Sequence, residues 1–146
     1  LEPAGIIILV TCAGGVLKQI LIDSGIGNIF AKHLISSNLP LLLLAFTTAM
    51  IIRITQGSAT VAMLTSSGLI ASILGDLNYS EQMLALLVIS IASGATCFSH
   101  VNDSGFWLVN RYLGLSVPDT LKTWSVTTGL IGVVSILLIL IISNFI

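Results

Sequence analysis

Charged side chains are scarce in this chain of 146 residues. Only 8% of the residues are Asp, Glu, Lys or Arg, whereas 55% are hydrophobic, and the mean hydropathy is +1.11. A soluble domain usually carries about a quarter charged residues, which cover its water-facing surface. This scarcity excludes an ordinary soluble domain and predicts an integral membrane protein whose partner is the lipid bilayer.

Basic residues and cysteines are also too few for several other kinds of function. The formal net charge is −1 and the basic residues form no stripe, so the sequence offers no support for nucleic-acid binding. The two cysteines, Cys12 and Cys97, each lie inside an apolar run. A disulfide framework or a metal site would need more ligands at closer spacing. We therefore expect two buried thiols, no metal and no cofactor.

The start of the chain lacks the features of a signal peptide. Its first ten residues, LEPAGIIILV, contain no methionine and no basic region, which a secretory signal would need. We expect the sequence to begin partway through a longer protein.

Long apolar runs predict the membrane-spanning segments. Residues 4–22 and 124–146 are each long enough to cross a bilayer, because about 20 helical residues span its hydrocarbon core. Residues 83–113 form a further apolar run, which the polar segment Ser99–Gly105 interrupts. After Asp23, hydrophobic residues recur at helical spacing between polar ones. This pattern predicts a short amphipathic helix in the membrane surface.

A second break interrupts the apolar stretch from residue 39 to residue 74. Two apolar runs flank the segment Gln56–Thr60, and each is slightly short for a full crossing. Lipid does not tolerate irregular backbone, so a break at membrane depth must be enclosed by protein or face water. We expect a re-entrant hairpin with its tip at Gly57–Thr60. The alternative is one helix with a glycine bend, followed by a polar return loop.

The two breaks share a composition that predicts one polar site. Each contains glycine and short hydroxyl side chains near an ionisable group: Arg53 precedes the first break, and His100 and Asp103 lie in the second. A lone Arg or Asp at mid-bilayer costs on the order of 2.5–3.5 kcal/mol, so we expect both breaks to face one hydrated cavity. Free N–H groups of broken helices attract a carboxylate, and free carbonyls coordinate a cation.

These residue types suit an anionic, polyhydroxylated solute that moves together with H⁺. Arg53 can pair with an anion, and Asp103 or His100 can exchange a proton. In the alternative interpretation, Arg53 pairs with Asp103 or reaches the interface, and His100 is a satisfied buried imidazole. Gly57 and Gly105 would then serve only close helix packing. The candidate neutral ligands for solute hydroxyls are Ser58, Thr60, Ser99, Asn102 and Ser104.

Three phrases of the sequence are long and unusual. They are GGVLKQILIDSGIGN (residues 14–28), RITQGSATVAM (residues 53–63) and SHVNDSGFWLVNRYLGLSVPDTLKTWSV (residues 99–126). These phrases resemble the carboxyl-terminal part of the gluconate permease family, the gluconate:proton symporters. The resemblance covers essentially the whole chain, which corresponds to roughly the last third of such a transporter.

The resemblance implies a multi-pass secondary transporter of the bacterial inner membrane. Such transporters contain inverted repeats, each with a re-entrant hairpin and a broken helix whose tips meet at the substrate site. The expected fold class is therefore all-α integral membrane. One repeat would comprise the surface helix, the re-entrant hairpin, the broken transmembrane helix and the final transmembrane helix. The resemblance assigns the hairpin tip to Gly57, Ser58, Ala59 and Thr60, and the break to Ser99, His100, Asn102, Asp103, Ser104 and Gly105.

The resemblance also implies a function and its partners. Substrates across the family include gluconate and related sugar acids, and D-serine for some members. We expect proton symport of such a solute and no enzymatic activity, with Na⁺ as the alternative coupling ion. Because the partner repeat is absent, the other half of the site would come from a missing amino-terminal repeat or a second chain, and a homo-oligomer is a further alternative.

Two competing interpretations stay open. The first is a truncated membrane fragment that does not transport. The second is a membrane-embedded hydrolase that uses Ser99, His100 and Asp103, although the sequence contains neither a nucleophile elbow nor a zinc-protease motif.

Overall fold

The computed structural model describes residues 23–24, 40–74 and 79–145. Within these ranges the regular structure is helical and contains no strand, which confirms the all-α prediction. The expected span over residues 4–22 and the surface helix after Asp23 lie outside the described residues.

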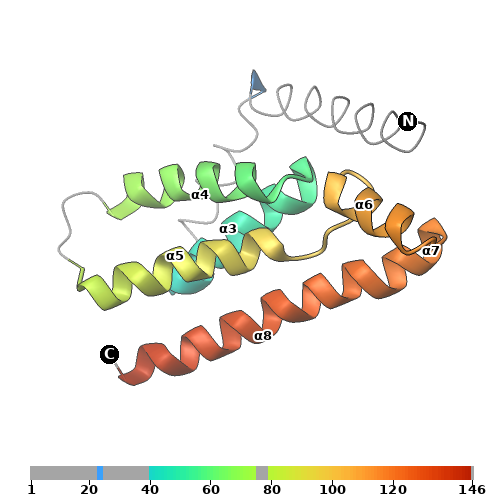
Figure 1. Cartoon of the computed structure of the whole chain (residues 1–146). Coiled ribbons are helices and arrows are strands. Elements are labelled where there is room, and N and C mark those ends of the chain that lie inside the picture. Colours follow the sequence, from blue (N-terminus) through green and yellow to red (C-terminus); the bar gives the residue numbers. More distant parts are fainter. Residues whose placement is uncertain (1–22, 25–39, 75–78, 146) are drawn as a thin grey trace.

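Helices α3 (Leu41–Gln56) and α4 (Ala59–Leu74) pack side by side and are joined by two residues, Gly57 and Ser58 (Figure 1). Gly57 ends α3 in the left-handed region, with φ +74°, where glycine pays little steric cost. Its N–H donates to the carbonyl of Arg53 at 2.8 Å, which closes the helix. Each helix has 16 residues, or about 24 Å of length. The re-entrant placement of this pair stays a prediction.

Helix α5 (Glu81–Thr96) packs against both helices of the hairpin. The hydroxyl of Ser80 accepts a hydrogen bond from the first turn and so caps its start. Gly94 lies against α3, where an added Cβ would be 2.2 Å from the carbonyl oxygen of Phe46. The absence of a side chain therefore lets the two backbones approach closely, as small residues do between membrane helices.

The last helical run is continuous from Val117 to Phe145. Its 29 residues are long and apolar enough to cross a membrane. The run contains four elements: α7 (Val117–Thr120), the π-helical turn η1 (Leu121–Ser125), α8 (Val126–Ile142) and the 3₁₀ turn η2 (Ser143–Phe145).

This run begins at Val117 rather than at Trp124, where the apolar pattern begins. The hydroxyl of Ser116 caps the first turn, and Pro118 lies at a position where a helix needs no N–H donor. Residues 114–123, which lack an apolar pattern, are therefore helical from Val117 onward, because capping residues can start a helix without such a pattern.

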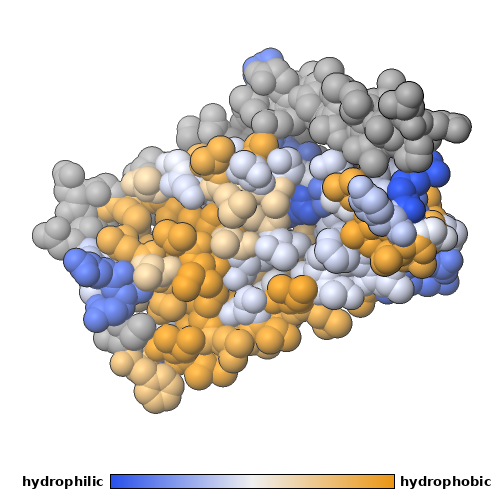
Figure 2. Space-filling view, in the orientation of Figure 1, coloured by the Kyte–Doolittle hydropathy of each residue, from blue (hydrophilic) through white to orange (hydrophobic). Residues whose placement is uncertain are grey.

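Residues 97–103 separate α5 from α6 (Ser104–Tyr112). Figure 1 shows the turn between α3 and α4, together with α6 and α7, at one end of the bundle, and the carboxyl terminus at the other. In Figure 2, apolar side chains gather over the half of the bundle near the carboxyl terminus, and pale, more polar ones gather toward α6 and α7. The exposed apolar residues of α8 include Leu130, Ile131, Val134, Leu137 and Leu138, as expected of a surface that faces lipid.

Candidate functional site

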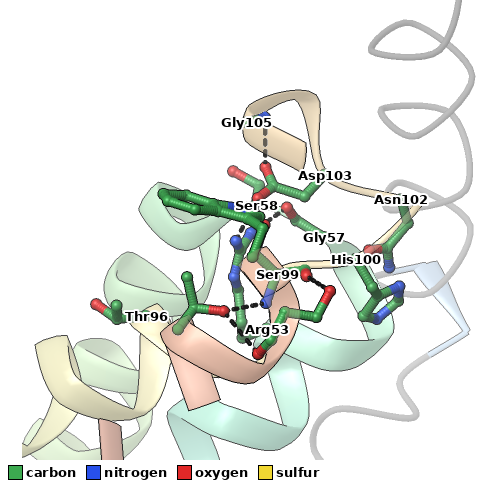
Figure 3. Close-up of polar contacts among 12 residues, drawn as sticks. Arg53, Gly57, Ser58, Thr96, Ser99, His100, Asn102, Asp103 and Gly105 are labelled. Atoms are coloured by element: carbon green, nitrogen blue, oxygen red, sulfur yellow. Dashed lines mark hydrogen bonds and ion pairs between the residues drawn. The ribbon is translucent and has the colours of Figure 1, made fainter. Parts of the chain in front are cut away.

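The structure brings the two breaks together. An added Cβ on Gly57 would be 2.2 Å from the carbonyl oxygen of Asn102. The side-chain amide of Asn102 donates to the carbonyl of Ile54 at 2.9 Å, and Nε2 of His100 lies 3.0 Å from the same oxygen. Figure 3 shows the Asn102 and His100 side chains at this junction, together with Arg53, Ser99 and Asp103. These two side chains therefore satisfy the carboxyl-terminal end of α3, whose last carbonyls have no partner within the helix. A hydrated cavity between the breaks stays a prediction.

Arg53 joins the two breaks through its buried guanidinium group. One of its terminal nitrogens lies 2.5 Å from Oδ2 of Asp103, and the other donates to the carbonyl of Gly57. Removing one partner of a buried ion pair leaves an uncompensated charge, at a cost of about 3–5 kcal/mol. The ion pair therefore joins the first break, at the hairpin tip, to the second break. This is the pairing that the alternative interpretation of Arg53 expected.

Asp103 accepts hydrogen bonds from three segments of the chain. Its Oδ1 accepts from the N–H of Gly105 at 3.0 Å, which caps α6. Its Oδ2 accepts from Arg53 and from the hydroxyl of Ser99. In this arrangement the carboxylate connects α3, the break and the first turn of α6.

Ser99 makes four hydrogen bonds, three of them to the last helical run. Its Oγ accepts from Nε1 of Trp124 at 2.9 Å. Its N–H donates to Oγ1 of Thr128 at 3.1 Å, and its carbonyl accepts from the hydroxyl of Ser125. None of these three partners is among the site residues that the sequence predicts. Their spacing at i, i+1 and i+4 was the available signal, since it puts three polar side chains on one helix face.

The other predicted residues lie at the ends of helices beside this junction. Ser58 is half-buried at the hairpin turn, and Ala59 and Thr60 begin α4, where Thr60 is exposed. Ser104 and Gly105 are half-buried in the first turn of α6. The first turns of both helices carry backbone N–H groups that have no partner within the helix, and such groups attract anions.

Three buried polar atoms at the junction have no hydrogen-bond partner among the residues that the structure describes. They are Nε of Arg53, Oε1 of Gln56 and Oδ1 of Asn102. Buried polar atoms in proteins are normally hydrogen-bonded, so these atoms are positions at which a polar solute or water would find partners. Among the described residues, no group of three or more His, Cys, Asp or Glu side chains is placed to hold a metal ion.

The contacts do not form the catalytic arrangement of a hydrolase. The hydroxyl of Ser99 bonds to Asp103 and Trp124, whereas the imidazole of His100 bonds to the carbonyl of Ile54. A nucleophilic serine requires a base within hydrogen-bond reach of its hydroxyl. In this structure, Ser99 has no such contact with His100.

Comparisons with known proteins point to transport. The chain is 48% identical over 134 residues to the low-affinity gluconate transporter of Escherichia coli (strain K12), a match that covers 92% of this chain and 30% of that protein. It is 47% identical over 137 residues to the inner membrane permease YgbN of the same strain, covering 90% and 29%. It is 39% identical over 137 residues to that strain's Gnt-II system L-idonate transporter, covering 94% and 30%. No solved structure matches the chain.

The chain thus spans a little under a third of the length of these relatives. The relatives are named as permeases and transporters, not as enzymes. The model of the GntP permease family matches residues 1–146, the whole of the sequence. The chain is therefore a bacterial inner-membrane protein that belongs to the GntP family of permeases.

Proposed function

We propose that this chain forms part of a proton-coupled symporter for gluconate or a related sugar acid, and that it supplies one half of the substrate site. The names of the relatives support the substrate class, since gluconate and L-idonate are both sugar acids. The observation that carries the mechanism is the buried ion pair between Arg53 and Asp103, which connects the two breaks. The other half of the site comes from a partner repeat in the same protein or from a second chain.

The ion pair suggests how a proton and an anion move together. When Asp103 takes a proton from the outer solution, its carboxylate loses its charge and its hold on Arg53 weakens. The freed guanidinium then binds the carboxylate of the substrate, because a planar guanidinium matches a carboxylate in two hydrogen bonds. When the proton leaves on the inner side, Asp103 pairs with Arg53 again and displaces the anion. One proton and one anion cross together.

His100 is the second proton-coupling residue in this proposal. Its Nε2–H donates to the carbonyl of Ile54 at the carboxyl-terminal end of α3, because that oxygen can only accept. A proton added at Nδ1 places a positive charge at this negative end of the helix dipole. Proton binding at His100 would therefore strengthen its contact with the Ile54 carbonyl, which joins the second break to the end of α3.

Polar atoms around the ion pair would recognise the hydroxyl groups of the substrate. The unpartnered Oδ1 of Asn102 accepts a hydroxyl, since its amide nitrogen is already committed to the carbonyl of Ile54. N–H groups at the starts of α4 and α6, other than those that Ser58 and Asp103 accept, donate to substrate oxygens. The proposed substrate-binding residues are Arg53, Gly57, Ser58, Ala59, Thr60, Ser99, Asn102, Ser104 and Gly105.

Substitution of the ion pair tests this function. We expect Arg53→Ala to abolish uptake of labelled gluconate into energised vesicles while the protein stays in the membrane. Asp103→Asn imitates the protonated carboxyl, so it should abolish uptake driven by a pH gradient but retain exchange of internal for external gluconate. The control is Arg111→Ala, since Arg111 is exposed on α6 and should tolerate substitution. Uptake driven by the pH gradient in both Arg53→Ala and Asp103→Asn would refute the proposal.

A second candidate is a membrane fragment that does not transport by itself. The match to 29–30% of the length of the relatives favours it. Vesicles that contain only these 146 residues would then take up no gluconate, and coexpression of the amino-terminal part of a relative would restore uptake. Uptake by the chain alone would exclude this candidate.

A further inference from the structure

We propose that the last helical run is the frame that holds the second break in place, and that Trp124, Ser125 and Thr128 are its positioning residues. They act through Ser99, which presents its hydroxyl to Asp103. Two of the three lie in the π-helical turn η1, which ends at Ser125, and π-helical turns are frequent at functional sites. The consequence for transport depends on the proposed function, but the structural role does not.

The direction of the hydrogen bonds assigns Ser99 to the frame. The indole N–H of Trp124 can only donate, so Oγ of Ser99 is the acceptor in that contact. The single proton of the Ser99 hydroxyl then points to Oδ2 of Asp103. Because the only proton of this hydroxyl is committed to Asp103, Ser99 positions the carboxylate of Asp103 in this state, and its hydroxyl has only its remaining lone pair to offer a substrate.

The frame also satisfies the backbone of the break. Residues 97–103 are not helical, so their N–H and C=O groups need partners from elsewhere if they are shielded from water. Thr128 accepts from the N–H of Ser99, and Ser125 donates to its carbonyl. The backbone N–H and C=O of Ser99, which is buried, therefore both bond to side chains of the last helical run.

Packing against α8 adds a third constraint. Phe98 has φ +49°, a left-handed conformation that costs a residue with a side chain about 1–2 kcal/mol. Its ring lies on Gly129, where an added Cβ would be 2.6 Å from Cε1 of the ring. Sγ of Cys97 lies similarly close to Gly132, at 2.0 Å from an added Cβ. A strained residue persists only where its surroundings hold it, and α8 supplies these surroundings.

Thr128→Val is the test substitution, because it keeps the shape of the side chain and removes the acceptor for the N–H of Ser99. Thr128→Ser restores the hydroxyl. The matched control is Thr127→Val, since Thr127 is the neighbouring residue and its side chain is exposed. Trp124→Phe is a second variant that keeps an aromatic ring without the N–H donor. All variants are made in the complete protein that contains this chain.

Two measurements test the structural role of the frame separately from the proposed transport function. The first is the rate at which N-ethylmaleimide alkylates Cys97, in a protein whose other cysteines, Cys12 included, are serine. Cys97 is fully buried and lies two residues before Ser99, so a loosened break would expose it. The second is the KM for gluconate uptake. Leaving a buried N–H without its partner shifts the equilibrium between the held and the loosened break by on the order of tenfold.

We expect Thr128→Val and Trp124→Phe to speed alkylation of Cys97 and to raise the KM, each roughly tenfold. Thr128→Ser should restore both values, and Thr127→Val should leave both unchanged. If the parent protein takes up no gluconate, the proposed function fails, while the alkylation rates still test the frame. Equal alkylation rates in the parent, Thr128→Val and Trp124→Phe would overturn the inference, whatever the uptake.

Discussion

The two breaks interrupt their helices in different ways. At the first, Gly57 donates to the carbonyl of Arg53 and accepts from the Arg53 guanidinium, so its partners lie four positions away. At the second, Ser99 bonds to residues 25, 26 and 29 positions further along. His100 and Asn102 bond to Ile54, which lies 46 and 48 positions earlier. The first turn is closed within its own helix, whereas the second break has hydrogen bonds to two distant helices in addition to its local ones.

This difference indicates how the two segments respond to change. A turn that its own helix closes keeps its conformation when its surroundings move, because its partners move with it. A segment that α3 and α8 hold from two sides changes when either helix shifts. We therefore expect the second break to be the part that rearranges during transport, and the hairpin tip to move as a unit. The ion pair between Arg53 and Asp103 is the link between them.

The largest effect should follow the loss of that link. Arg53→Met leaves the buried carboxylate of Asp103 without its charge partner, and we expect a loss of about 3–5 kcal/mol in the free energy of unfolding. The double variant Arg53→Met, Asp103→Asn should recover most of this loss, because the amide is neutral and its oxygen still accepts from Gly105. Denaturant unfolding of the purified protein in detergent measures both. Equal stability of the single and double variants would contradict the prediction.

The second prediction separates local strain from contact between the breaks. Gly57→Ala places a side chain on left-handed backbone, at about 1–2 kcal/mol, and forces Asn102 to move, at about a further 1–3 kcal/mol. Gly114 has φ +63°, but no described residue has an atom within 4 Å of an added Cβ there. Gly114→Ala should therefore show only the strain. If both variants lose the same stability in detergent, the two breaks are not in contact in solution.

A third pair of variants tests the packing of the helices that lie between the two breaks in the sequence, α4 and α5. Gly94→Ala places a Cβ 2.2 Å from the backbone carbonyl of Phe46, which must shift, at about 1–3 kcal/mol. At Gly68 on α4, an added Cβ would have no neighbour within 4 Å in the described part of the chain, so Gly68→Ala should be neutral or slightly stabilising through helix propensity. The thermal midpoint of unfolding reports both. A loss in Gly68→Ala that matches Gly94→Ala would argue against the packing of α5 on α3.

The smallest effect belongs to the end of the bundle that lies away from both breaks. Ser80 caps α5, and its hydroxyl accepts from the N–H of Met83 at 3.2 Å. Ser80→Ala should cost about 1 kcal/mol of stability and leave the KM for gluconate unchanged, since the cap lies far along α5 from the break (Figure 1). A raised KM would show that the two ends of the bundle are coupled.

Much of the local structure follows from short-range chemistry, and the sequence predicts it. Apolar runs broken by glycine and hydroxyl residues predict helices that end at Gly57 and near Ser99, because these residue types are typical of turns. The polar clusters likewise identify both breaks as candidate sites. Ser116, which caps the last helical run, and Pro118, in its first turn, indicate a helix start that hydrophobic periodicity alone does not reveal. The substrate-binding roles, the re-entrant placement and the choice of coupling ion stay predictions.

Only the tertiary structure decided which distant groups are partners. The sequence allowed Arg53 to bind a substrate anion or to pair with Asp103, and the folded chain joins it to Asp103, 50 positions away. It also allowed Ser99 to be a ligand, and the fold surrounds it with Trp124, Ser125 and Thr128. Periodicity constrains contacts within one helix, because the helix repeat relates residues three and four apart. Contacts between helices depend on how their backbones pack, which small residues such as Gly94 and Gly132 permit but do not specify.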